Sequence, residues 1–176
     1  MKDLFVILDT SGSIALAGNH KIGQINDLLR DLISVTNGKY ERAYIITYSD
    51  MPRIYWKSAS GEIFMDIPAG EFGGRSGLGA AYEFVGKIIS SDSSSAARAC
   101  LVLISDGSAT DNYKKALKKL DPKGESARVA GLLGSSGAVT YTLDYHVGDA
   151  KNVYPDVSGY VVRDEFFDEI VTKLEK

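Results

Sequence analysis

The chain has 176 residues, of which 44% are hydrophobic and 24% are charged, a composition that is typical of a globular domain. Its net charge of −3 argues against nucleic-acid binding, because no basic block outweighs the acidic background. Its one cysteine excludes an intrachain disulfide, and no apolar run approaches the roughly 20 residues that a membrane-spanning helix needs.

We therefore expect a single domain over residues 1–176 that contacts neither nucleic acid nor a membrane. A strand-like pattern begins almost at the N-terminus and leaves no room for a signal peptide with a basic start and a cleavage site. A cytoplasmic location is the expectation that follows.

The first half of the chain alternates strand-like and helical patterns. Residues 4–8 are five consecutive apolar residues, which indicates a strand buried on both faces. Apolar residues at helical spacing predict a helix over 22–33, and the β-rich run 43–48 predicts a second strand. Residues 54–56 follow a turn too tight for a crossover helix, so this strand should pair antiparallel at a sheet edge.

The second half continues the alternation. A helix is predicted over residues 78–89, and a fully apolar strand over residues 100–104. Further helices are predicted at Tyr113–Leu120, Ala127–Leu133 and 166–174, and further strands at 138–145 and 159–162. Strand–helix alternation of this kind is typical of a parallel sheet with helices on both faces.

A carboxylate and two hydroxyls follow the first strand directly. Because Asp9, Ser11 and Ser13 alternate along the chain, an extended turn would place these three oxygens on one side, where they could converge on a cation. Oxygen ligands without a nearby His or Cys suit Mg²⁺ or Mn²⁺ rather than zinc. The alternative is that these residues only form a turn and cap the next helix.

Two further segments are expected at the same edge of the sheet. Asp106 follows the strand 100–104, and ligands of doubly wound sheets bind beyond the carboxyl ends of the strands. The loop Gly73-Gly74-Arg75-Ser76 opens the helix at 78 and adds a hydroxyl, although Ser76 could also serve only as a helix cap. Together the three segments predict a cation site made of Asp9, Ser11, Ser13, Ser76 and Asp106.

These motifs resemble those of a known family. The segments Asp9-Thr10-Ser11-Gly12-Ser13, 73–76 with 78–81, and Ile104-Ser105-Asp106-Gly107 resemble the von Willebrand factor type A domain and its metal-ion-dependent adhesion site. The resemblance covers about residues 4–174 and is closest to small bacterial TerY-like proteins associated with tellurite resistance. It implies an α/β fold, a Rossmann-like doubly wound sheet of five parallel strands plus one antiparallel edge strand, with helices on both faces.

The resemblance also implies a cofactor and a function. One divalent cation, usually Mg²⁺ with Mn²⁺ as the alternative, would be held through the hydroxyls of Ser11, Ser13 and Ser76, with Asp9 and Asp106 acting directly or through waters. The domain would be a protein-binding module rather than an enzyme, and its metal would dock an acidic group of a partner protein. By the same analogy, a kinase or a phosphatase of a bacterial stress-response module would be the partner.

Two departures keep other interpretations open. The family usually has threonine where Ser76 stands, and Arg75 adds a cation that should weaken metal binding unless it points away or pairs with an acid. A metal-free scaffold is therefore one alternative. A Mg²⁺-dependent phosphoryl-transfer or hydrolytic enzyme is the other, although the chain lacks a P-loop lysine and a G-x-S-x-G motif.

The helix expected at Tyr113–Leu120 carries a basic face. This face consists of Lys114, Lys115, Lys118 and Lys119. It is either a solvated surface or a contact for phosphate or for an acidic partner surface.

Overall fold

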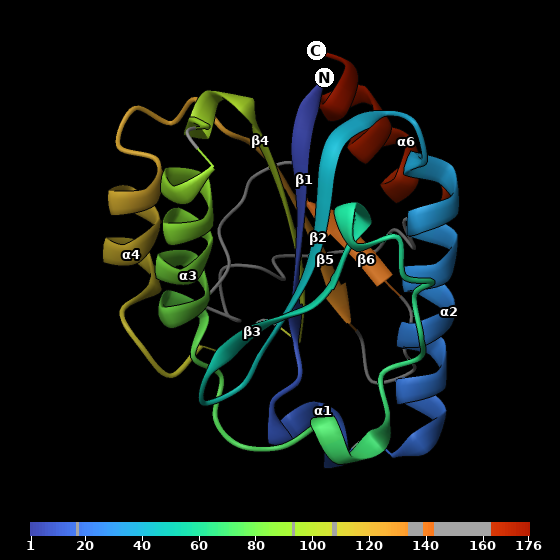
Figure 1. Ribbon diagram of the computed structural model, residues 1–176. Coiled ribbons are helices and arrows are strands. Elements are labelled where there is room, and N and C mark those ends of the chain that lie inside the picture. Colours follow the sequence, from blue (N-terminus) through green and yellow to red (C-terminus); the bar gives the residue numbers. More distant parts are fainter. Residues whose placement is uncertain (17, 93, 107–108, 134–138, 143–162) are drawn as a thin grey trace.

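The computed structural model describes residues 1–16, 18–92, 94–106, 109–133, 139–142 and 163–176 of the chain (Figure 1). The strands in these residues are β1 (Lys2–Asp9), β2 (Tyr40–Tyr48), β3 (Pro52–Lys57), β4 (Ala99–Ser105), β5 (Ala127–Leu133) and β6 (Val139–Thr142). They form one sheet with the order β3-β2-β1-β4-β5-β6.

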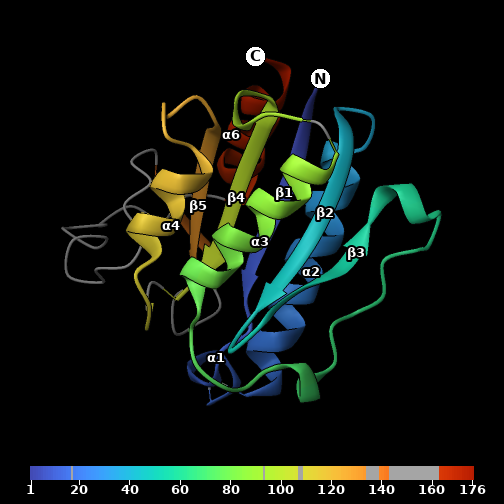
Figure 2. The same ribbon diagram turned by 60° about the vertical axis from the view of Figure 1, so that its left-hand side comes forward.

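Helices cover both faces of the sheet (Figures 1 and 2). One face carries α2 (Asn19–Thr36) and α6 (Arg163–Glu175), and the other carries α3 (Leu78–Ser91) and α4 (Tyr113–Leu120). The short elements are α1 (Gly12–Leu16) and the 3₁₀ turns η1 (Ser58–Ser60), η2 (Ala69–Glu71) and η3 (Ala96–Arg98). No helix in the described part of the chain combines the length and the apolar character that crossing a membrane requires.

The central strand β1 shows how the sheet is covered on both sides. Its even-numbered apolar residues, from Leu4 to Leu8, pack in one core with α2 and α6, whereas Phe5 and Ile7 pack in the other core with α3. Successive strand residues point to opposite faces, so a strand covered on both sides requires a continuous apolar run. The prediction of a buried strand at residues 4–8 is confirmed.

The α/β fold class is confirmed, as a mostly parallel sheet between two layers of helices. The strand directions differ in part from the expected five parallel strands and one antiparallel edge strand. In the described residues β1, β2, β4 and β5 run parallel, and both edge strands, β3 and β6, run antiparallel to their neighbours. The antiparallel edge strand expected at 54–56 is β3, and the strand expected at 159–162 lies outside the described residues.

The prediction of a helix at Ala127–Leu133 is wrong, because this segment forms β5. It pairs in parallel with β4, from Cys100 opposite Ala127 to Ser105 opposite Leu132. Val129 and Ala130 are buried in the two different cores. A short apolar run fits a buried helix and a buried strand equally well by periodicity alone, and here the edge that β4 offers makes it a strand.

Of the strand expected at 138–145, residues 139–142 form β6, which pairs antiparallel with β5, and the rest of that range lies outside the described residues. Only five residues separate Leu133 from Val139 in the sequence. So short a connection cannot hold the crossover that a parallel neighbour needs. The described sheet is therefore bounded by an antiparallel strand at each edge.

The reactivity of the Cys100 thiol tests whether the helices shield the sheet from reagents in solution. Its side chain is fully buried in β4, and burial raises the pKa of the thiol to about 12. Because only the thiolate reacts, we expect a disulfide reagent such as DTNB to label the native chain slowly, at a rate that denaturant increases. The exposed variant Ser34→Cys should label at once in the same buffer, and equally fast labelling of Cys100 would contradict the burial.

Candidate metal centre

The carboxylate of Asp9, at the carboxyl end of β1, joins three segments of the chain. It is fully buried, and its Oδ1 accepts a hydrogen bond from the backbone N–H of Ser11 at 2.8 Å. Its Oδ2 accepts hydrogen bonds from the hydroxyls of Ser105 at 2.9 Å and Ser76 at 3.1 Å. The ends of β1 and β4 and the loop before α3 thus meet at one carboxyl group.

Ser11, Ser13 and Asp106 continue this network toward the surface. The hydroxyls of Ser11 and Ser13 lie 3.1 Å apart, and the Ser13 hydroxyl donates to Oδ2 of Asp106. Asp9 and Ser11 are buried, Asp106 is half-buried and Ser13 is exposed. All five residues predicted for the site therefore lie together, with their outer members accessible from solvent.

The two hydroxyls reach this position by a route that differs from the expected extended turn. Gly12 begins α1, and the carbonyl of Ser11 accepts the N–H groups of Ile14 at 3.1 Å and Ala15 at 3.3 Å. The start of a helix, rather than side-chain alternation, brings Ser11 and Ser13 to the same side.

Backbone hydrogen bonds hold the glycine-rich loop against the end of β1. The Gly73 N–H donates to the Thr10 carbonyl at 2.8 Å, and the Gly12 N–H donates to the Gly74 carbonyl at 3.0 Å. Gly74 has φ of +76°, and a Cβ there would collide with the carboxylate of Asp50. The loop thus needs glycine at this point to deliver the buried Ser76 hydroxyl to Asp9.

Two residues of the site were missed by sequence reasoning. Ser105 is buried, and it lies beside Asp9 because Leu8 pairs with Ile104 one residue earlier. The sequence feature that could have indicated Ser105 is a hydroxyl at the end of an otherwise apolar strand, next to Asp106. Asp111 accepts the N–H groups of Gly79 at 2.8 Å and Ala80 at 3.1 Å, which fixes the start of α3. No local sequence pattern predicts this contact, because more than 30 residues separate Asp111 from its partners in the sequence.

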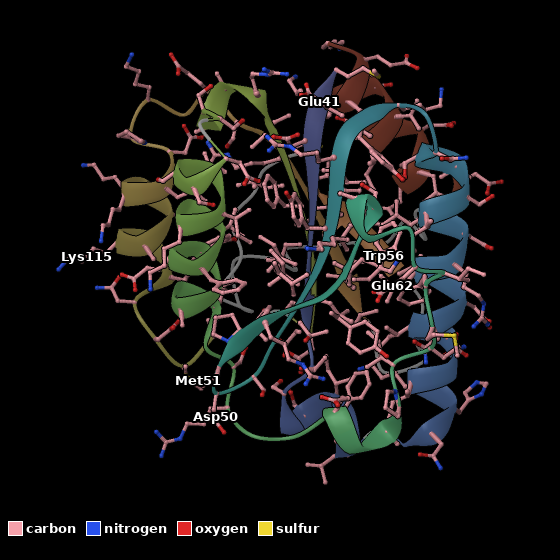
Figure 3. The ribbon with its side chains drawn as sticks, in the orientation of Figure 1. Glu41, Asp50, Met51, Trp56, Glu62 and Lys115 are labelled. Carbon is pink, nitrogen blue, oxygen red and sulfur yellow. The ribbon has the colours of Figure 1, made fainter. Side chains whose placement is uncertain are left out.

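Arg75 lies at the surface of the loop. It is exposed, and among the described residues its side chain has no ion pair with a carboxylate. Its backbone N–H donates to Oδ1 of Asp50 at 3.2 Å, and Figure 3 shows Asp50 at the same end of the molecule as α1. The loop arginine is therefore tied to Asp50 through its backbone.

The electrostatics of the centre favour a positive charge. The pKa of the Asp9 carboxyl is raised, mainly because the group is buried and also because of the negative charge of Asp106. Hydrogen bonds from Ser11 and Ser105 oppose this shift but do not cancel it. Two carboxylates close together in a protein interior repel each other when both are ionised. A cation between them would remove that repulsion.

The donor set fits a hard divalent cation. Each serine hydroxyl that donates its proton to a carboxylate keeps its lone pairs available for a metal. No group of three His, Cys, Asp or Glu side chains that could hold a metal occurs in the described ranges, so hydroxyls would have to supply part of any metal shell. Oxygen donors of this kind suit Mg²⁺ or Mn²⁺.

The chain belongs to the von Willebrand factor type A domain family. The family model matches residues 4–109, which contain all the predicted site residues. Domains of this family often mediate protein–protein interaction through metal sites, and they are generally interaction modules rather than enzymes.

Solved structures share the fold. The chain is similar to a von Willebrand factor type A protein of Catenulispora acidiphila (12% identity, TM-score 0.59, 99% of this chain and 42% of that chain). It is similar to manganese-loaded TRAP protein of Plasmodium vivax (18% identity, TM-score 0.54, 74% of this chain and 56% of that chain). It is also similar to proximal thread matrix protein 1 of the mussel byssus with a zinc-occupied MIDAS motif (15% identity, TM-score 0.55, 74% of this chain and 37% of that chain).

The chain thus spans less than two thirds of the length of each of these three proteins. At such identities the likeness shows the fold alone. A comparison with curated proteins finds no match.

The raised pKa of Asp9 predicts how stability depends on pH without metal. The folded state holds the Asp9 proton more tightly than the unfolded state, whose pKa is near the ordinary 3.8. This stabilisation is complete below the unfolded pKa and is lost as pH rises through the folded pKa. We expect Asp9→Asn to remove this part of the pH dependence and to unfold at higher urea than wild type at neutral pH in EDTA.

Urea titrations between about pH 4 and 7 measure this effect. Asp168→Asn, at an exposed position on α6, is the matched control and should keep the wild-type pH dependence. If Asp9→Asn kept it as well, the buried carboxyl would not be the group that titrates.

Proposed function

We propose that the chain is a divalent-cation-dependent protein-binding module whose metal docks an acidic group of a partner protein. The cation would be Mg²⁺ or Mn²⁺. Its ligands would come directly or through waters from Asp9, Ser11, Ser13, Ser76 and Asp106. The observation that carries the proposal is the convergence of two carboxylates and three hydroxyls at one end of the sheet.

The mixture of donors explains why such a site would recognise an acid. Three of the five proposed ligands are neutral hydroxyls, so the chain places at most two negative charges on a divalent cation. The chain can therefore at most neutralise the ion, and where a carboxylate acts only through a water, the ion stays electrophilic and can bind a further carboxylate oxygen, a ligand that Mg²⁺ prefers. The exposed Ser13 and the half-buried Asp106 leave the outer side of the centre open to a partner.

Two structures that share the fold contain divalent metals, which supports a divalent cation in this fold. One of them is described as manganese-loaded, and another has a zinc-occupied MIDAS motif. The absence of a histidine base also favours binding over catalysis in the described residues. His20 is exposed in α2, outside the network of Asp9, and His146 lies outside the described residues.

The resemblance to TerY-like proteins extends the proposal to a cellular setting. We infer a cytoplasmic module of a bacterial stress response, of the kind associated with tellurite resistance, with a kinase or a phosphatase as the partner. This step rests on the motifs at residues 9–13, 73–76 and 104–107.

Metal binding should appear as a change in thermal stability. A ligand at about 100 times its dissociation constant adds about 2.7 kcal/mol to the folded state, or about 5–10 °C in melting temperature for a chain of this size. We expect this rise on replacing EDTA with Mg²⁺ or Mn²⁺ for the wild type, and no rise for Ser13→Ala or Asp106→Asn.

Ser90→Ala is the matched control, because Ser90 is an exposed serine at the end of α3 away from the Ser76 loop, and its hydroxyl donates to the Gly86 carbonyl rather than to the network of Asp9. A full metal response in Ser13→Ala would remove that hydroxyl from the site. No response in the wild type would contradict the proposal and support a metal-free scaffold.

Partner binding should depend on the same centre. We expect proteins captured by the immobilised domain in Mg²⁺ to be released by EDTA and to be missing from the Asp9→Ala domain, while Ser90→Ala captures them normally. Mass spectrometry of the released proteins tests for a kinase or a phosphatase. Capture that is unchanged by Asp9→Ala would contradict the metal-dependent docking.

A further inference from the structure

Helix α4 presents a strongly basic face on the outside of the α3–α4 layer. Four of its eight residues are lysines, and it contains no acidic residue. Lys114, Lys115, Lys118 and Lys119 are all exposed, and none forms an ion pair with a carboxylate of the described residues. Figure 3 shows Lys115 pointing away from the body of the molecule. The face stands out because the whole chain has a net charge of −3.

Part of this arrangement is electrostatically unfavourable for the helix itself. Lys114 and Lys115 lie in the first turn, where the helix dipole favours acidic side chains. Lys118 and Lys119 follow four residues after them, so each pair places like charges on neighbouring turns, which destabilises a helix. Lys118 and Lys119 lie in the last turn, where the dipole favours cations, so the dipole accounts for these two lysines but not for Lys114 and Lys115. Local rules are commonly broken in this way at functional positions.

A hollow lies beside this face, and two lysines of the face, Lys114 and Lys118, line it. Its volume is about 410 Å³, and its lining includes the cationic side chains of Lys114, Lys118, Lys123 and Arg128. Leu117 and Pro122 add apolar surface to the lining. The hollow thus combines an apolar lining with a cationic rim.

The acidic residue in the lining does not neutralise the rim. Asp121 is buried, and its carboxylate accepts the backbone N–H groups of Glu125 at 2.8 Å and Ser126 at 3.0 Å. Its nearest oxygen lies 3.9 Å from the Arg128 guanidinium, and Lys123 lies 4.0 Å from Glu125. Lys114 and Lys118 keep their charges available.

We propose that the α4 face and its hollow are a second docking surface, which binds a short acidic peptide segment of a partner protein independently of the metal centre. The acidic side chains of the segment would meet Lys114, Lys118 and Lys123, and an apolar side chain would enter the hollow against Leu117 and Pro122. This surface goes beyond the metal-dependent function and does not depend on it.

The size and chemistry of the surface favour a peptide over nucleic acid. Eight helical residues span only about 12 Å, which is too short to follow many phosphates. An apolar side chain has a place in the hollow, whereas a phosphate backbone would leave that surface unused.

Fluorescence anisotropy with a defined probe tests this surface. The probe is a fluorescein-labelled octapeptide with acidic residues around a central leucine, and EDTA in the buffer removes the metal centre from the measurement. We expect the wild type to bind the probe with an affinity that falls as salt is added, and Lys114→Gln/Lys118→Gln to bind it about tenfold more weakly. The control Lys87→Gln/Lys176→Gln changes the net charge equally and should bind as the wild type does.

Thermal melts without the probe show whether the lysines serve the fold. Because the double substitution on α4 removes like-charge repulsion and glutamine is a good helix former, its melting temperature should equal or exceed that of the wild type. A lower value would contradict the idea that the lysines are kept for binding.

Three binding results would overturn the proposal. These are no binding of the probe by the wild type, equal binding by the α4 variant, and tighter α4-dependent binding of a short oligothymidine or of phosphatidylserine vesicles than of the peptide. None of these results would affect the metal-dependent function, whose test is the response to Mg²⁺ at Ser13 and Asp106.

Discussion

The buried carboxylate of Asp9 is the interaction on which the centre depends. It accepts one backbone N–H and two serine hydroxyls, which come from the start of α1, the loop before α3 and the end of β4. A buried charge is stable only when its oxygens are paired with donors, so these three segments cannot separate without exposing an unpaired carboxylate.

The apolar sheet and the polar centre are consequences of the same parallel pairing. Apolar strands covered on both faces fix β1 against β4, with Leu8 opposite Ile104. The next residues of both strands, Asp9 and Ser105, are therefore neighbours at the point where the covering helices begin. Polar residues are tolerated there because donors from α1 and the 73–77 loop reach them. The distance between Asp9 and Ser105 therefore follows from the pairing of β1 with β4, which the apolar core holds in place.

Charged side chains of opposite sign gather in two separate regions of the molecule. The proposed metal centre gathers negative charge and would attract a cation, whereas α4 gathers positive charge without any described acidic partner. Both regions carry an electrostatic cost, a buried carboxylate near a half-buried one in the first and like charges on adjacent helical turns in the second. A bound ligand would offset costs of this kind, which is why we propose both regions for binding.

Much of this organisation was determined by the sequence alone. The apolar runs at residues 4–8 and 100–104, the helix at 78–89 and the oxygen-rich segments at their ends predicted the α/β class and the five residues that meet at the centre. They could be predicted because buried strands and helix starts leave strong local patterns. The tertiary structure decided whether Ala127–Leu133 became a strand, because only the edge of β4 distinguishes a buried strand from a buried helix in a short apolar run. It also decided the direction of β6 and the roles of Ser105 and Asp111, since these follow from pairing and long-range hydrogen bonds that no local pattern encodes.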